Sequence, residues 1–269
     1  MEHWILGGMA ALGLAIIALC LVIFGRLLAS VWAGHGKVKA EVFFFGDLML
    51  ATVLISWLGG LAVHGFLHAE SIQPMTDRAI LLSAVLFGLV VGLIALFLRI
   101  RQISVTQLFG LGVGNRLGTL KTGAKLFFAV MPLILFFSAL VQLFFGKDAE
   151  PQEIIKYFAE AARHSEHWRL ILVAVVSVLI APMMEEFIFR GYFYGVLRRY
   201  FGVIPALLFI SALFALIHVN VTALLPLFVL AVGLTLAYET TGSLLAPMLM
   251  HALFNAVMLG TIFYISQHS

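Results

Sequence analysis

Six polar residues of kinds that occur in catalytic sites stand in otherwise apolar stretches of the second half of the chain. They are Glu185, Glu186, Arg190, His218, His251 and Asn255. A carboxylate or an imidazole can take a proton from water, and amide or cationic groups can stabilise a developing oxyanion. Together these side chains have the chemistry to hydrolyse an amide bond with water as the nucleophile.

The spacing of these residues indicates which of them can meet on one helix. Glu186 and Arg190 are four residues apart, so on a helix they share a face and can neutralise each other. Glu185 is rotated by about 100° from Glu186 and points elsewhere. His251 and Asn255 are also one turn apart on a common face. The pattern predicts one acid held in an ion pair, Glu186, and one acid available for chemistry, Glu185.

The elements that carry these residues are predicted to be membrane helices. Of the 269 residues, 63% are hydrophobic and 11% are charged, whereas soluble domains carry about 25% charged residues. Apolar runs long enough to cross a bilayer, roughly 20 residues each, recur along the whole length. We therefore expect an all-α fold, a polytopic transmembrane helical bundle of about eight membrane helices. The expected spans are residues 4–24, 42–64, 79–98, 124–145, 169–198, 203–219, 223–239 and 243–265.

Depth along these helices places the reactive side chains near the middle of the membrane. At about 1.5 Å per residue, Glu185 lies roughly 20 Å above the cytoplasmic boundary. By the same rule, His218 lies roughly 22 Å into the sixth span and His251 roughly 12 Å into the last. The hydrocarbon core is about 30 Å thick, and an ionisable group at that depth suggests a functional site. We expect these three residues and Asn255 to converge from three helices on one buried, hydrated pocket.

Simpler interpretations compete with a catalytic one. The two acids could mark the exit of the fifth span, but residues 191–197 are membrane-compatible and the arginine pair at 198–199 is a more natural anchor. A single membrane histidine is more often a hydrogen-bonding residue between helices than a catalyst. The prediction therefore depends on the combination of residues. Asp47 and Glu239, near the predicted boundary, are interpreted as structural.

Basic residues predict the orientation of the chain. They gather around residues 26–39, 99–121 and 198–199, which fall on one side of an eight-span topology. The positive-inside rule assigns that side to the cytoplasm and both termini to the outside. We expect a multi-pass protein of the cell membrane and no nucleic-acid partner. A short amphipathic helix from Gln152 to about Arg163 should lie on the outer surface.

Three motifs resemble those of the CPBP intramembrane peptidases, a family that includes CAAX prenyl proteases and bacteriocin-processing enzymes. They are Glu-Glu-x-x-x-Arg at 185–190, Phe-x-x-x-His at 214–218 and His-x-x-x-Asn at 251–255. Their order and spacing match, and the resemblance covers roughly residues 168–260. On this basis residues 1–150 are N-terminal transmembrane helices without a readable motif, and residues 151–269 form a peptidase core.

The resemblance also implies a role for each residue. Glu185 would be the general base that activates the hydrolytic water together with His218. His251 and Asn255 would stabilise the oxyanion, and the ion pair described above would support the site.

The sequence leaves the need for a metal open. Glu185, His218 and His251 could supply a His₂Glu zinc set, but the chain has no H-E-x-x-H motif. It also has no G-x-S-x-G motif, and its one cysteine, Cys20, is far from the cluster, which disfavours an acyl-enzyme. We expect no cofactor and keep zinc, on those three ligands, as the alternative.

The expected activity is that of an intramembrane endopeptidase that uses a glutamate-activated water. Its substrates would be membrane-associated peptides or proteins: CAAX tails, bacteriocin leaders, signalling peptides or membrane-protein segments. A transporter or proton relay is an alternative, because buried Glu, His and Arg also conduct ions, although no inverted repeat is apparent. A non-catalytic scaffold or immunity protein is a third possibility. The sequence does not indicate an oligomeric state.

Overall fold

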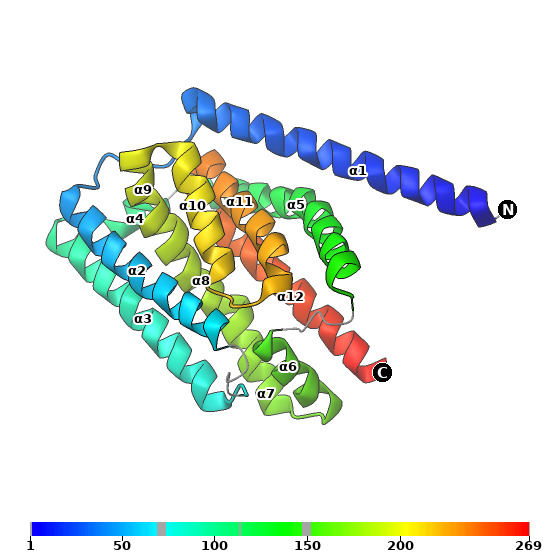
Figure 1. Cartoon of the computed structure of the whole chain (residues 1–269). Coiled ribbons are helices and arrows are strands. Elements are labelled where there is room, and N and C mark those ends of the chain that lie inside the picture. Colours follow the sequence, from blue (N-terminus) through cyan, green and yellow to red (C-terminus); the bar gives the residue numbers. More distant parts are fainter. Residues whose placement is uncertain (1, 69–73, 113, 147–151, 269) are drawn as a thin grey trace.

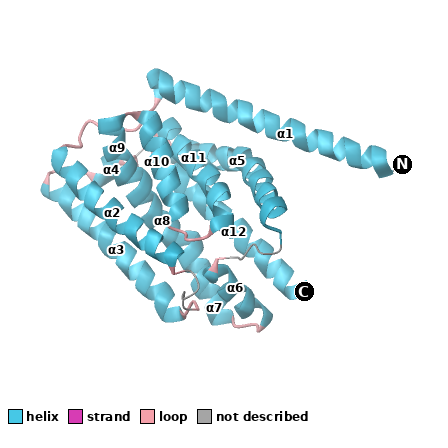
Figure 2. Ribbon diagram, in the orientation of Figure 1, coloured by secondary structure: helices cyan, strands magenta, loops and turns pink. Residues whose placement is uncertain are grey.

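A computed structural model describes residues 2–68, 74–112, 114–146 and 152–268. Every regular element in these ranges is a helix (Figures 1 and 2). The α-helices are α1 Glu2–Ser30, α2 Phe45–Leu67, α3 Asp77–Ile100, α4 Val105–Leu108, α5 Arg116–Phe145, α6 Glu153–Arg163, α7 His167–Ala174, α8 Ala181–Glu186, α9 Tyr194–Phe201, α10 Val203–Leu216, α11 Leu224–Thr241 and α12 Leu245–His268. Three π-helical segments, Val31–His35, Val175–Ile180 and Phe187–Phe193, and a 3₁₀ turn, Val221–Ala223, join or extend them.

Seven helices in the described ranges are long and apolar enough to cross a membrane, and the predicted all-α polytopic bundle is confirmed. They span Ala11–His35, Phe45–Leu67, Asp77–Ile100, Arg116–Phe145, His167–Phe201, Val221–Thr241 and Leu245–His268. The one expected span that is not among these seven is 203–219. It corresponds to the shorter apolar helix α10, of 14 residues. At about 1.5 Å per residue it is roughly 21 Å long, less than the thickness of a hydrocarbon core.

Helix α1 lies apart from the bundle for most of its length (Figure 1). It contacts α5 and α11, while large apolar side chains such as Leu12, Leu14 and Leu19 are exposed. The other helices pack around a shared core in which residues of α2 and α3 contact residues from the second half of the chain. The two predicted halves therefore share one core, although their predicted boundary at 150–151 lies outside the described residues.

The basic loops meet at one end of the bundle, where main-chain contacts join them. Lys37 donates its backbone N–H to the Glu239 carbonyl at 2.8 Å, and Leu244 donates to the Phe109 carbonyl at 3.0 Å. The Ser243 hydroxyl donates to the Gly110 carbonyl at 2.6 Å. This end, which we call the basic end, contains the loops that precede α2, follow α3 and precede α12.

Two buried acids are paired at this same end. The Asp47 carboxylate is 2.5 Å from Arg101, and Glu239 is 2.6 Å from Arg198 and accepts a 2.5 Å hydrogen bond from Tyr194. Both carboxylates are fully buried. A buried charge is tolerated when it is paired and hydrogen-bonded, so the contacts of Asp47 and Glu239 are those of structural residues.

Candidate active site

The two glutamates lie in the middle of a continuous helix that runs from His167 to Phe201 and has π-helical segments on both sides of α8. The segment Val175–Ile180 immediately precedes Pro182 in α8. A proline inside a helix removes one hydrogen bond and crowds the preceding turn, and a π-helical turn is one way to absorb that change. Single π-helical turns occur often at functional sites.

Glu186 is the centre of a fully buried polar cluster. Its Oε1 accepts a hydrogen bond from Arg190 Nη1 at 2.9 Å, across the four-residue spacing. The same oxygen is 2.9 Å from Nδ1 of His251. Glu186 and Arg190 are completely buried, and His251 is nearly so. Because a carboxylate only accepts hydrogen bonds, Nδ1 of His251 carries a proton and a neutral ring leaves Nε2 as an acceptor. The ion pair therefore also orients His251.

Glu185 faces a different direction from Glu186. Its Oε2 is buried, and no described residue donates a hydrogen bond to it. This oxygen is 3.9 Å from Nε2 of His251. One unpaired carboxylate oxygen thus faces the free nitrogen of an oriented imidazole.

His218 is not inside a helix, which corrects the expected span 203–219. Helix α10 ends at Leu216, and His218 lies in the turn before the 3₁₀ segment. Val219 has φ of +46°, a left-handed conformation that a right-handed helix cannot contain. Nδ1 of His218 is 2.7 Å from the Phe214 carbonyl, so it carries the proton and again leaves Nε2 free in the neutral ring.

Phe214 joins the polar groups into one cluster, a role that sequence reasoning missed. Its ring centroid is 4.9 Å from that of His218 and 5.6 Å from that of His251. The Arg190 guanidinium lies 4.3 Å from the same ring centroid. The four-residue spacing between Phe214 and His218 could have indicated their ring contact, because residues four apart on a helix share a face.

Asn255 does not join this cluster through a hydrogen bond. Its side-chain Nδ2 donates to the Ser177 carbonyl at 2.7 Å, which ties α12 to the π-helical segment before α8. Asn255 therefore contacts the same long helix that carries Glu185. The amide nitrogen has two hydrogens, and this hydrogen bond uses one of them.

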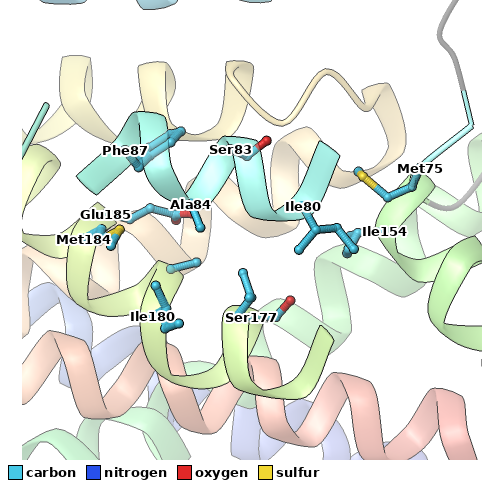
Figure 3. Close-up of a pocket in the computed structure, with 12 residues that line it drawn as sticks. Met75, Ile80, Ser83, Ala84, Phe87, Ile154, Ser177, Ile180, Met184 and Glu185 are labelled. Atoms are coloured by element: carbon cyan, nitrogen blue, oxygen red, sulfur yellow. The ribbon is translucent and has the colours of Figure 1, made fainter. Parts of the chain in front are cut away.

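Glu185 lies at one end of an apolar cavity of about 180 Å³ between α3, α6 and the α7–α8 region (Figure 3). Met75 and Ile154 lie at the other end in Figure 3. The walls between them include Ala84, Ile180 and Ser177, whose carbonyl accepts the hydrogen bond from Asn255. The cavity therefore connects the unpaired acid with the end of the bundle that contains α6.

The polar groups lie in the part of the chain that matches a family model. Residues 167–257, about a third of the chain, match the model "Type II CAAX prenyl endopeptidase Rce1-like". This segment is similar to the CAAX proteases. The match confirms the resemblance to CPBP peptidases over these residues and supports a CAAX-type intramembrane endopeptidase. With seven helices long and apolar enough to cross a membrane in the described residues, the chain is a multi-pass membrane protein. No curated protein and no solved structure matches the chain.

The imidazoles and carboxylates of this polar cluster are of the kinds that bind zinc. In the described residues, no group of three His, Cys, Asp or Glu side chains lies close enough to hold a metal ion. Glu185, His218 and His251, the zinc ligands considered from the sequence, are among these described residues and do not form such a group.

Proposed function

We propose that the chain cleaves peptide bonds inside the membrane with a water molecule that Glu185 activates. The observation that carries this proposal is the unpaired, buried Oε2 of Glu185, 3.9 Å from Nε2 of His251, in a residue that also lines an apolar cavity. A carboxylate in such a position can act as a general base for water. Glu186 is less suited to this role, because its Oε1 is held by Arg190 and His251 and its side chain has no exposed surface, although its Oε2 is also unpaired.

The proposed reaction needs one base for both proton transfers. The water oxygen bonds to the carbonyl carbon of the substrate while a water proton passes to Glu185. The same proton then goes to the amide nitrogen as the carbon–nitrogen bond breaks, which gives an acid and an amine. His251, held by Glu186, accepts the second hydrogen bond from the water and so aims it.

The remaining polar groups would stabilise the charge on the substrate oxygen. The second amide hydrogen of Asn255 is a neutral donor for the oxyanion. His218 has a free Nε2 in the neutral ring, and its ring contacts Phe214, which also contacts His251 and Arg190. In a neutral ring, the free Nε2 of each histidine accepts a hydrogen bond and cannot donate one. Asn255 therefore takes the oxyanion-donor role that the resemblance had assigned to His251 and Asn255 together.

The direct test is Glu185→Gln, which keeps the size of the side chain and removes the base. We expect the purified variant to fold with an unchanged melting temperature and to lose cleavage of a membrane-peptide library by about 10²-fold or more. Peptide products are measured by mass spectrometry. Met183→Gln is the matched control, because Met183 lies on the same helix with an exposed side chain. Cleavage by Glu185→Gln at the wild-type rate would refute the proposal.

A metal measurement on the same preparation distinguishes the water-only reaction from a zinc reaction. Protein stripped with a chelator should keep its activity, with far less than one metal ion per chain by elemental analysis. Zinc that leaves in stoichiometric amount together with the activity, and restores it on return, would make Glu185, His218 and His251 ligands after local rearrangement.

A further inference from the structure

A polar cavity of about 610 Å³ lies at the basic end of the bundle. Its walls come from the segment before α2, from α4 and the loop after it, and from the first residues of α5 and α12. It shares no lining residue with the cavity beside Glu185. This cavity, which we call the basic cavity, is therefore separate from the candidate active site.

The basic cavity lies where membrane-crossing helices end. Its walls include Arg116 and Leu245, the first residues of α5 and α12, and α4, which follows the end of α3 at Ile100. The hydrogen bonds from Ser243 and Leu244 to the loop after α4 hold these parts together. The ends of membrane-crossing helices lie at the level of the lipid headgroups. A ligand in this cavity would therefore be at headgroup depth.

The lining of the basic cavity is cationic. Lys39 and Arg116 contribute two positive charges, and the described residues of its walls include no acid. The buried acids of the basic end do not compensate these charges, because they are paired with other arginines, Arg101 and Arg198. Hydroxyl and amide groups come from four further wall residues, Thr106, Gln107, Asn115 and Thr119. Such a lining favours an anion that accepts hydrogen bonds.

The guanidinium of Arg116 is held by the loop that precedes α5. Its Nε donates to the Gly112 carbonyl at 3.2 Å, and its Nη2 donates to the Leu111 carbonyl at 3.4 Å. These bonds use two of its five N–H hydrogens. A planar guanidinium with N–H groups left over suits the oxygens of a phosphate, and the ammonium of Lys39 adds a point charge of the kind that also binds phosphate.

We propose that the basic cavity binds the phosphate group of an anionic phospholipid from the membrane leaflet at the basic end. Basic pockets between membrane helices on the cytoplasmic side bind such headgroups, and the positive-inside rule assigns this end to the cytoplasm. The bound headgroup joins the segment that carries Lys39 to the first turn of α5. This site does not depend on the proposed peptidase activity.

Removing the two charges distinguishes a site from general attraction to the basic end. The cavity variant carries Lys39→Gln and Arg116→Gln. The control carries Lys121→Gln and Arg199→Gln, which removes the same charge from exposed positions outside the cavity. Dioctanoyl phosphatidylglycerol is titrated into each purified protein in an uncharged detergent, and binding is measured by calorimetry. We expect the control to bind as the parent does and the cavity variant to bind about tenfold or more weakly, since each basic residue adds to headgroup affinity.

Filling the cavity gives a second test that leaves the charge unchanged. Thr119→Trp, at a half-buried wall position, should weaken phosphatidylglycerol binding by about tenfold or more, since a filled pocket excludes its ligand. The matched control is Leu117→Trp, at an exposed position two residues away, and it should bind as the parent does. Equal effects of the cavity variants and their controls in both tests would overturn the site.

Two further ligands identify the source of the phosphate. Dioctanoyl phosphatidylcholine has the same chains but a neutral headgroup, and we expect it to bind about tenfold or more weakly. Inorganic phosphate lacks the acyl chains that apolar helices can cover, and it should also bind about tenfold or more weakly. Phosphatidylcholine that binds as tightly as phosphatidylglycerol would overturn the anion site, and inorganic phosphate that binds as tightly would overturn a lipid as its ligand.

Discussion

At the scale of residues, a single carboxylate oxygen of Glu186 contacts both Arg190 and His251. Glu186 Oε1 accepts hydrogen bonds from both Arg190 and His251. The local spacing predicted only the first of these contacts. Glu186 is thus expected to act as a positioning residue for His251 in addition to stabilising Arg190.

The variant Glu186→Gln should therefore affect both stability and activity. A completely buried Arg190 without its counter-charge should cost about 3–5 kcal/mol of stability, measured by denaturant unfolding in detergent. Cleavage should also fall, because His251 loses its charged acceptor. Adding Arg190→Met should restore stability but not cleavage, since it removes the stranded charge without returning the acceptor. Full recovery of cleavage in the double variant would show that Glu186 serves Arg190 alone.

At the scale of elements, close packing of α2 fixes the turn that carries His218. A Cβ atom at Gly65 in α2 would lie 2.9 Å from a methyl group of Val219. Val219 is already in a left-handed conformation and its side chain is stiff. The absence of a side chain at position 65 therefore lets α2 approach the end of α10.

A side chain at position 65 should displace this turn and reduce activity. We expect Gly65→Leu to lower kcat/KM by about tenfold or more, since small misplacements in a catalytic site are costly. The same change at Gly60, where a Cβ would meet no atom within 4 Å, is the control. Kinetics on a cleaved peptide, with melting temperatures of both variants, checks the expectation. Equal rates for the two variants would mean that α2 does not position His218.

At the scale of the whole molecule, the basic loops and helix α6 lie at opposite ends (Figure 1). The positive-inside rule assigns the basic end to the cytoplasm. In a Cys20→Ala background, single cysteines replacing Gln107 and Tyr200 should react with an impermeant thiol reagent from the cytoplasmic side. One replacing His164, in the turn after α6, should react from the outside. All three positions are exposed. Labelling of Gln107 and His164 from the same side would contradict this arrangement of the helices.

The sequence alone determined the class of the protein, the order of its membrane helices and the Glu186–Arg190 pair. These features depend on apolar run length and on four-residue spacing, which are local properties of the chain. The motif residues could also be chosen from the sequence, because charged and imidazole groups are costly in an apolar environment and therefore stand out.

Only the tertiary structure decided how these groups meet. His251 reaches Glu186 across 65 positions, and Asn255 reaches the Ser177 carbonyl across 78. Hydropathy could not show that α10 ends at Leu216, because apolar residues such as Ile217 and Val219 follow it and the end is set by the backbone of Val219. The rotation of one helix against another and the filling of the space between them depend on side-chain packing from the whole bundle. For that physical reason, the cavity that Glu185 lines could be seen only in the folded molecule.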